Sequence, residues 1–535
     1  MNKTNLMILV VRRSLGALML LLAGLSPLPA QMKQFDQAML GASYHTPLQT
    51  ANWPLKIGPE SQLFVDDYLI HSKVGIVRAP HQPVKYSGNP ILVADRPWEL
   101  QDKSHIYANG SIMFDPESKQ YRMYYDGAHV VAFSKDGVNW TKPNLGLIEY
   151  KGSKDNNIVI DYNNPTDLGS FIYDPRDPDP SRRWKAAIFH YDRGENPRWA
   201  KNAGQYGDRS GVYAFYSKDG LDWGKDAQMI LPGRRGKLAG STWPLTGVDD
   251  VTTVTWDEGL KKFVAWMKVW DLTDGRYYRA RSIATSDDFT HWSQPLPSLL
   301  PDKKDPPDAQ FYGMTGWYYE GMWLGLLRTL HSATGSQQVD LQLVTSRDGI
   351  HWERALNRAA FIPSGPEGSH DHGYHSDFAS PPLRIGDELY FYYAGTPYGK
   401  VWGPSEIKSG ICLAKLRVDG FASLHAAGKV HASPTTDTEH AVITRPLDFT
   451  GRELFVNAKA GSGAVRVEVL TGDTDDKLDP IPGFTAKECV AVSGDGIELA
   501  VRWQNHQDLG ALAGKRIRLK FYLEGFAGLY SFKIR

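Results

Sequence analysis

Short runs of alternating apolar and polar residues recur along most of this chain. Val212-Tyr-Ala-Phe-Tyr216 and Leu341-Gln-Leu-Val-Thr345 are two examples, and a polar turn follows each of them. Such runs predict β-strands joined by hairpins, and almost no sustained helical periodicity follows the first thirty residues. The pattern therefore predicts an all-β protein.

Four of the turns share one seven-residue pattern, Ser-x-Asp-x-x-x-Trp. They occupy residues 134–140, 217–223, 286–292 and 346–352. The Asp is expected to accept backbone N–H bonds, the Gly that follows it in three copies supplies a positive φ, and the Trp packs back on the hairpin. The tryptophans lie 83, 69 and 60 residues apart, which suits four-stranded propeller blades with loop insertions. An eroded fifth copy at Val418-Asp419-Gly420 predicts five blades.

The same pattern predicts the domain organisation. Residues 101–428 are expected to form a five-bladed β-propeller, in which each blade opens with a polar first strand. After about residue 430, alternating segments such as Val465–Leu470 and Ile517–Leu523 predict a C-terminal β-sandwich over residues 429–535. Residues 31–100 form an extension with one or two strands, which would pair with the sandwich or lie along the propeller edge.

The N-terminus and the overall charge bear on where the protein acts. Arg12 and Arg13 precede an apolar run, and small residues near Ala30 offer a cleavage site, so residues 1–30 are predicted to be a signal peptide of a periplasmic or secreted protein. A membrane anchor is the alternative, but the run is shorter than the roughly 20 residues that span a bilayer. Lys+Arg and Asp+Glu both number 60, so no net charge favours nucleic acid or an anionic membrane. Cys412 and Cys489 are expected to be unpaired.

Several motifs resemble those of one group of exported bacterial proteins, which are described as similar to the N-terminal domain of glycoside hydrolase family 32. The motifs are Leu63-Phe-Val-Asp-Asp-Tyr-Leu-Ile70, Lys142-Pro-Asn-Leu-Gly-Leu-Ile148, Gly152-Ser-Lys-Asp-Asn-Asn-Ile158, Asp174-Pro-Arg-Asp-Pro-Asp179, Gly365-Pro-Glu-Gly-Ser369 and the Asp-Leu-x-x-Leu-x-Gly at 508–514. The resemblance implies the five-bladed propeller that families 32, 43 and 68 share, with three acidic residues around a central funnel. It also implies a β-sandwich after the propeller.

The acid triad of those families does not carry over to this chain. The Trp-Met-Asn-Asp-Pro-Asn-Gly motif is missing from the sequence, and no Glu-Cys pair follows Arg-Asp-Pro within the predicted propeller, residues 101–428. Arg176-Asp177-Pro178 matches Arg-Asp-Pro in letters, but it lies in a predicted hairpin loop rich in turn-forming residues. We therefore expect this segment to have a structural role.

Glycoside cleavage needs one carboxylic acid and a second carboxylate that acts as base or nucleophile. In a propeller these groups are expected on first strands or on loops that enter the funnel. The sequence predicts Glu367 or Asp371 as the acid, and Asp249, Asp250 or Asp102 as the base or nucleophile. The predicted substrate-binding residues are His105, Asp308, His370, His372, His375, Asp377, Arg281 and Arg328.

Three functions are compatible with these patterns. The first is an exported glycoside hydrolase that acts on an oligo- or polysaccharide of plant, algal or microbial origin. The second is a non-catalytic carbohydrate-binding propeller. The third is a metal- or His-dependent lyase on acidic glycans, suggested by the three histidines of the 370–375 segment and by nearby arginines. His-x-His spacing alone is a weak metal signal, so no metal or other cofactor is predicted.

Overall fold

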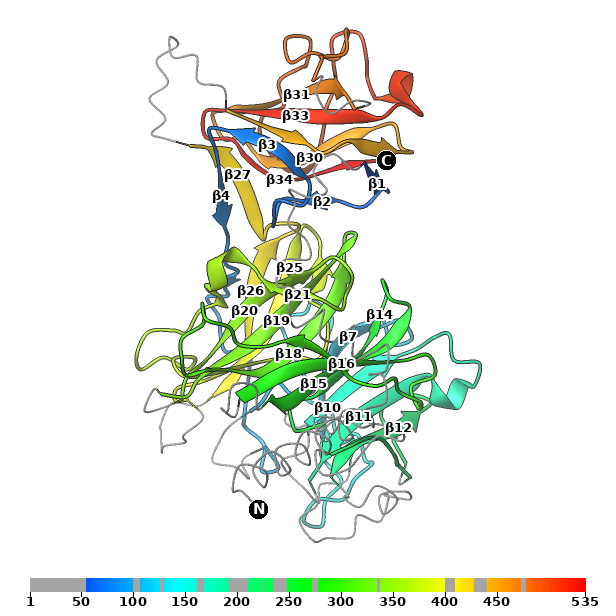
Figure 1. Cartoon of the computed structure of the whole chain (residues 1–535). Helices are drawn as coiled ribbons and strands as arrows, with labels where there is room; N and C mark the ends of the chain where they lie inside the picture. Colours follow the sequence, from blue (N-terminus) through cyan, green and yellow to red (C-terminus); the bar gives the residue numbers. More distant parts are fainter. Residues whose placement is uncertain are drawn as a thin grey trace, which may run out of the picture. The chain divides into compact units, whose positions relative to one another are not determined.

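A computed structural model describes residues 54–99, 106–125, 129–160, 168–191, 210–224, 226–233, 248–271, 278–333, 337–399, 409–427, 440–472 and 478–535. Strands and a few short 3-10 helices make up its regular structure, which confirms the all-β prediction (Figure 1). The predicted signal peptide, residues 1–30, lies outside the described residues. Within the described ranges, no helix has the length and apolar character needed to cross a membrane.

Five antiparallel sheets follow one another along the middle of the chain, and we number them sheets 1 to 5. Sheet 1 contains β7 (Ile112–Asp115), β8 (Gln120–Tyr125) and β9 (Val130–Ser134). Sheet 2 contains β10 (Leu168–Tyr173), β11 (Trp184–His190), β12 (Gly211–Ser217) and β13 (Gln228–Pro232). Sheet 3 contains β14 (Thr253–Asp257), β15 (Lys262–Asp271), β16 (Tyr278–Ser286) and β17 (Leu296–Leu299).

Sheets 4 and 5 complete the series. Sheet 4 contains β18 (Ala309–Tyr319), β19 (Met322–His331), β20 (Val339–Ser346), β21 (Trp352–Arg354) and β22 (Ala360–Ile362). Sheet 5 contains β23 (Tyr374–Asp377), β24 (Leu383–Ile385), β25 (Glu388–Thr396) and β26 (Gly410–Arg417). A single parallel pair, Val339 with Tyr374, joins the two sheets. Two strands from before sheet 1, β5 (Val84–Lys85) and β6 (Leu92–Val93), pair with β26, so the N-terminal extension completes the last sheet.

Hydrogen bonds link each of the five sheets to the next one, and the fifth sheet back to the first. Most of them involve the first strand of a sheet or the residues just before it. Phe171 N donates to Ser111 Oγ, Val254 N to Ser170 Oγ, Thr253 Oγ1 to Met314 O, the Arg328 guanidinium to Asp377 O and Ala108 N to Ser376 Oγ, at 2.6–3.2 Å. These bonds run from sheet 1 to 2, 2 to 3, 3 to 4, 4 to 5 and from sheet 5 back to sheet 1. Four of these bonds use a buried serine or threonine hydroxyl, and the fifth uses the Arg328 guanidinium, so buried polar groups connect each sheet to the next.

Two further sheets enclose one hydrophobic core that the chain builds from both of its ends. One contains β1 (Leu55–Ile57), β3 (Ile70–Val74), β28 (Ala441–Thr444), β29 (Leu447–Phe449), β31 (Ala464–Thr471) and β33 (Ile517–Glu524). The other contains β2 (Gln62–Leu63), β4 (Ile76–Pro80), β27 (Ala422–Ala426), β30 (Leu454–Lys459), β32 (Asp495–Ala500) and β34 (Gly528–Ile534). Figure 1 shows the blue N-terminal strands among the orange and red C-terminal ones. Phe64, Phe521 and Phe532 pack together at the centre of this core.

The repeated turns have the predicted geometry. Asp136 Oδ1 accepts the backbone N–H groups of Val138 and Asn139 at 2.9 and 2.8 Å, and the same bonds recur in the other three copies. The glycines of three copies have φ of 71–75°, whereas the third copy places Phe289 at φ 70°. That side chain is fully buried and packs against Phe263, which offsets the cost of the left-handed backbone.

Three of the four tryptophans of these turns also pack against a neighbouring sheet. Trp140 contacts Tyr392 of sheet 5, Trp223 contacts Tyr124 of sheet 1, and Trp352 contacts Trp266 of sheet 3. Both cysteines are buried and free, and Cys412 lies in β26, as expected for a buried strand residue. The repeats are therefore local turns that also fix each sheet to a neighbour.

Replacing Asp136 by Asn is expected to lower stability at pH 6 and to weaken its dependence on acid. Hydrogen bonds from the backbone of Asn139 lower the pKa of Asp136. Because the folded-state pKa lies below the unfolded one, the carboxylate stabilises the fold above about pH 4, and this contribution is lost as pH falls through the folded pKa. Urea unfolding at pH 6 and pH 3 measures the difference. Asp287→Asn, at an exposed position within the third repeat that precedes the turn's acceptor Asp288, should leave the pH dependence unchanged.

Candidate functional site

Sheet 3 presents four functional side chains on one face. In the register of β15 and β16, Lys268 lies opposite Arg281 and Trp270 lies opposite Arg279. Because residues two apart on a strand share a face, these side chains form a two-by-two group. The face is turned toward sheet 4, since the Tyr312 ring lies 4.7 Å from Lys268 Nζ and 5.3 Å from the Arg279 guanidinium.

Two neighbouring carboxylates join this group from the segment before β14. Asp249 accepts a 2.5 Å hydrogen bond from the Trp270 indole, and its carboxylate lies 3.6 Å from Lys268 Nζ. Asp250 forms an ion pair with the same ammonium group. The Asp249 side chain is 12% exposed and that of Asp250 is 21% exposed. Asp250 is therefore the more accessible carboxylate of the two.

Arg281 is the least exposed of the four side chains on this face. It is almost fully buried, and its guanidinium donates to the carbonyl oxygens of Trp266 and Val251 at 2.6 and 3.2 Å. Burial, followed by the neighbouring Arg328 cation, lowers the pKa of Arg281 to about 9. At neutral pH the side chain still carries its charge, so it contributes positive potential beneath the two carboxylates.

A second buried cation connects three sheets. Arg328 of β19 pairs with the Asp377 carboxylate of β23 and donates to Asn109 Oδ1 at 3.0 Å. The Arg328 side chain is 1% exposed and that of Asp377 is 2% exposed. Tyr107 and Tyr312 each make an edge contact with Tyr374 beside this pair. Burial raises the pKa of Tyr312 and of Tyr374, so both hydroxyls stay protonated.

We call this group the central cluster. Its described members are Tyr107, Asn109, Asp249, Asp250, Lys268, Trp270, Arg279, Arg281, Tyr312, Arg328, Tyr374 and Asp377. They come from sheets 1, 3, 4 and 5 and combine carboxylates, cations and aromatic rings. Such a set can hold a sugar ring by stacking and hydrogen bonds, and can supply an ionised carboxylate to a reaction centre.

The histidine-rich segment does not form one site. Asp371 is 2% exposed and pairs with Lys85 of β5 at 2.6 Å. Burial acts to raise the pKa of Asp371, but the Lys85 ammonium outweighs it and the pKa is lowered. Because a lowered pKa favours the ionised carboxylate, this environment does not suit a residue that must donate a proton. Glu367 is exposed on a turn. Its role as an acid stays a prediction, since no contact of its side chain bears on it.

The three histidines of this segment have different surroundings. His375 is fully buried, and its Nε2 donates to Asp371 O at 2.8 Å. Burial lowers the pKa of His375 and keeps the ring neutral. His372 Nδ1 lies 3.2 Å from Gly365 O, and His370 is half-buried. Among the residues that the structure describes, no cluster of three metal-ligating side chains occurs.

The remaining predicted residues fall outside the cluster or outside the described residues. The Asp308 carboxylate accepts the backbone N–H of Ala333 at 2.9 Å, which is a loop contact. Asp102 and His105 lie outside the described residues. The structure thus brings together five predicted residues, namely Asp249, Asp250, Arg281, Arg328 and Asp377.

Six members of the central cluster were not predicted from the sequence as site residues. They are Lys268, Trp270, Tyr312, Tyr374, Tyr107 and Asn109. Lys268 could have been recognised as a candidate from the sequence. A lysine in the apolar run Phe263–Trp270 must either pair with an acidic group or interrupt a buried face. The tyrosines could not have been recognised as site residues in this way, since buried tyrosine is common in the strands of this chain.

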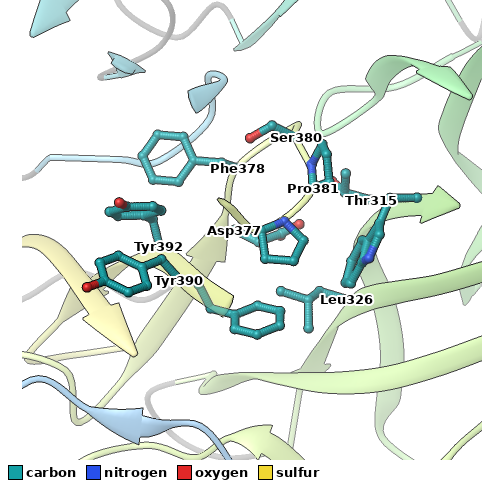
Figure 2. A pocket seen from close by; sticks show the side chains of 11 residues that line it. Thr315, Leu326, Asp377, Phe378, Ser380, Pro381, Tyr390 and Tyr392 are labelled. Carbon is teal, nitrogen blue, oxygen red and sulfur yellow. The ribbon is translucent and has the colours of Figure 1, made fainter. Parts of the chain in front are cut away.

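A small cavity borders the Arg328–Asp377 pair. Figure 2 shows Asp377, Thr315, Leu326 and Tyr390 around it. Its volume is about 20 Å³, enough for roughly one water molecule and far too small for a sugar. The cavity is therefore a feature of the packing between sheets 4 and 5.

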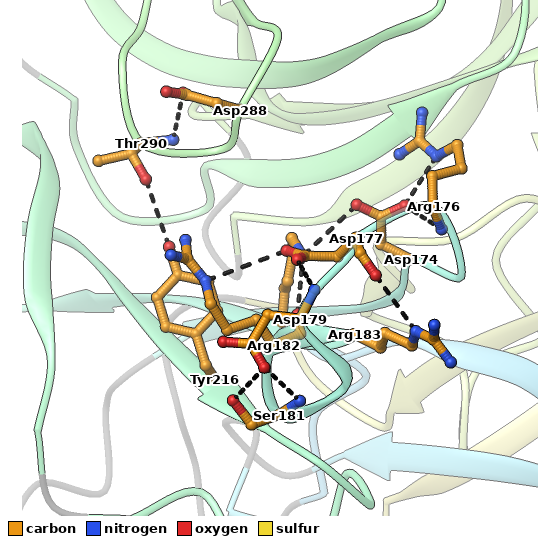
Figure 3. Close-up of polar contacts among 11 residues, drawn as sticks. Asp174, Arg176, Asp177, Asp179, Ser181, Arg182, Arg183, Tyr216, Asp288 and Thr290 are labelled. Atoms are coloured by element: carbon orange, nitrogen blue, oxygen red, sulfur yellow. Dashed lines mark hydrogen bonds and ion pairs between the residues drawn. The ribbon is translucent and has the colours of Figure 1, made fainter.

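The Arg176-Asp177-Pro178 segment has the predicted structural role. Asp177 pairs with the buried Lys185 at 2.6 Å, and Asp179 accepts the N–H and the hydroxyl of Ser181 (Figure 3). These bonds fix the hairpin between β10 and β11 around a single 3-10 turn, Pro180–Arg182. The segment does not carry a catalytic aspartate of the family pattern into the central cluster.

Comparisons with known proteins give structural similarities alone. No protein-family profile matches the chain, and no curated protein sequence does. An N-acetylgalactosamine deacetylase from F. plautii, solved with blood group B trisaccharide, is similar at 16% identity and a TM-score of 0.37, over 64% of this chain and 94% of that one. A thermostable family-43 glycoside hydrolase is similar at 11% identity and a TM-score of 0.38, over 58% and 89%. These TM-scores are too low to bear on the chemistry of this chain.

Proposed function

We propose that this protein is an exported glycoside hydrolase, built as a five-bladed β-propeller (residues 101–428) and a β-sandwich (residues 429–535). The closed order of contacts among sheets 1 to 5 supports the propeller, because consecutive sheets that return to the first one enclose a central axis. The shared core of the last two sheets supports the sandwich. The N-terminal sequence supports export.

The single observation that carries the proposal is the meeting of Asp249 and Asp250 with Lys268, Trp270 and Tyr312 in the central cluster. Asp250 is assigned as the base or nucleophile, because it is the more accessible carboxylate and its ion pair with Lys268 fixes it within the cluster. Asp249 holds the Trp270 ring by its indole N–H, so it positions a surface on which a sugar can stack.

The proton donor is assigned to Glu367, one of the two acids that the sequence predicts. Asp371 is less suited to that role, because its carboxylate is buried against Lys85. The substrate is an oligo- or polysaccharide, and no metal or cofactor takes part in this proposal.

The test is to incubate the mature protein with a panel of neutral and acidic glycans and to analyse the products. New reducing ends without an unsaturated sugar identify a hydrolase, whereas an unsaturated product identifies a lyase and contradicts the proposal. Binding without any product identifies a carbohydrate-binding protein and also contradicts it. Glu367→Gln, compared with Asp371→Asn, then separates an acid from a structural ion pair, since loss of Asp371 should reduce stability more than turnover at a permissive temperature.

A further inference from the structure

We propose that His81, Ser423 and His425 form an acid-sensitive contact at the place where the chain passes between sheet 5 and the last two sheets. His81 Nε2 lies 2.6 Å from Ser423 Oγ, and the same oxygen lies 2.6 Å from His425 Nε2. Ser423 is fully buried, whereas both imidazole rings are half-buried. Protonation of both rings loosens this contact at mildly acidic pH.

The contact lies at two connections between these parts of the fold. His81 lies between β4 of the last two sheets and β5 of sheet 5, while Ser423 and His425 belong to β27, which follows β26 of sheet 5. The two connections are side by side, since the backbone N–H of His81 donates to Phe421 O at 3.0 Å. Strands β4 and β27 then pair along their whole lengths. A change at the two rings therefore acts on both connections at once.

A single hydroxyl cannot serve two protonated imidazoles. The Ser423 hydroxyl has one proton, so with both rings neutral it donates to one ring and accepts an N–H bond from the other. When both rings are protonated, each Nε2 carries a hydrogen, and the hydroxyl proton loses its acceptor inside the fold. Two imidazolium ions would also lie close together, since the ring centroids are 6.5 Å apart. The second protonation is therefore unfavourable in this contact.

The face that carries the two rings also carries charged groups from neighbouring strands. Tyr530 of β34 lies against His81, with 5.3 Å between the ring centroids, and the Arg417 guanidinium lies 5.2 Å from the Tyr530 ring. Arg417 pairs with Asp495 of β32, and Lys459 of β30 lies opposite Asp495 in the strand register. Asp495 is therefore already paired with a cation.

Two more charged groups come from the turn before β27 and from β4. The Asp419 carboxylate accepts the hydroxyl protons of Tyr319 and Ser531 at 2.7 Å each. Arg78 of β4 pairs with Asp67. The carboxylates near the contact thus bond to other groups, and the histidines receive no compensating anion from them.

Both rings resist protonation in the folded protein. Burial lowers the pKa of His81, and the neighbouring His425 ring lowers it further. Burial also lowers the pKa of His425, although a hydrogen bond to the backbone of Ala527 acts in the opposite direction. Because both folded-state values lie below the ordinary value of 6.5, the folded protein binds fewer protons than the unfolded chain once the pH falls below that value. The contact therefore stabilises the fold fully above about pH 6.5, and this contribution is lost as the pH falls through the folded-state values.

Hydrogen exchange of the mature protein at pH 7 and pH 5 tests the inference. After correction for the intrinsic effect of pH on exchange, the backbone amides of β4 and β27 should exchange about 5- to 100-fold faster at pH 5, the range for one buried polar group left without a partner. Strand β15 of sheet 3 should show the same corrected rate at both pH values. The contact lies outside the central cluster, so this result does not depend on glycan cleavage.

Glutamine variants assign the response to the two rings. His81→Gln together with His425→Gln keeps side-chain donors and acceptors but removes both titrating rings, so the acid response should disappear. His81→Gln alone should also lose it, because a second protonation is no longer possible. His291→Gln is the matched control, since His291 is 87% exposed in the third repeat, and it should keep the full response. Equal exchange of β4 and β27 at the two pH values, a response that survives in the double variant, or an equal acceleration in β15 would each overturn the inference.

Discussion

Replacing Asp250 by Asn is expected to lower kcat/KM on a cleaved glycan by about 10²- to 10⁴-fold, the range for loss of a general base. The substitution removes one carboxylate oxygen and its negative charge, and it preserves the size of the side chain. Because Asp250 lies at the surface of the cluster, paired to Lys268, the fold should survive the change. Initial rates at saturating and limiting substrate measure the effect.

Two further variants make this result specific to Asp250. Asp249→Asn keeps an oxygen that can accept the Trp270 indole N–H, so its loss of activity should be smaller. Asp287→Asn changes an exposed carboxylate paired to Lys262 and should not alter kcat/KM. Full activity in Asp250→Asn would remove the assignment of the reaction centre. An equal loss in Asp287→Asn would show a general effect on the protein.

Replacing Arg328 by Met is expected to lower the free energy of unfolding by about 3–5 kcal/mol, as is typical when one partner of a buried ion pair is removed. The substitution leaves the Asp377 carboxylate buried without its cation, and it also removes the donor to Asn109. Sheets 1, 4 and 5 lose a common contact. Equilibrium unfolding in urea measures the change.

A double-mutant cycle separates the pair from the arginine alone. Asp377→Asn added to Arg328→Met removes both charges, so the double variant should lose less stability than the sum of the single losses. Lys262→Met breaks an exposed pair, in which Lys262 and Asp287 are 39% and 80% exposed, and should cost no more than about 1 kcal/mol. A cost for Arg328→Met as small as that of Lys262→Met would show that the buried pair does not hold the sheets together.

The repeated turns were predictable because each needs only seven consecutive residues. The Ser-x-Asp-x-x-x-Trp pattern contains its own acceptor, and in three copies its own glycine. The alternating strands after residue 430 were predictable for a similar reason. Val465, Val467 and Val469 form a buried face of β31, and Arg466 on the other face is half-buried, although Glu468 and Leu470 on that face are buried as well.

The sheets with which the N-terminal strands pair were not predictable from the residues of those strands. In the structure, β1 to β4 enter the last two sheets, whereas β5 and β6 pair with β26. A short strand offers the same backbone groups to any sheet edge, so its partner depends on the rest of the fold. Strand pairing also bears on the boundary expected between residues 428 and 429. Strand β27 (Ala422–Ala426) precedes that boundary in the sequence, yet it pairs with β4 and β34 of the last two sheets.

The sequence by itself determined an all-β chain with four local turns of one design, and it identified Asp249, Asp250, Arg281, Arg328 and Asp377 as candidates. Only the tertiary structure decided which of the candidates meet. Asp371 and Asp377 are six residues apart, yet one pairs with Lys85 and the other with Arg328. Strand register and contacts between sheets bring together residues far apart in the chain. No local pattern of side chains encodes that register, so the chemistry of the central cluster emerges only when the sheets pack.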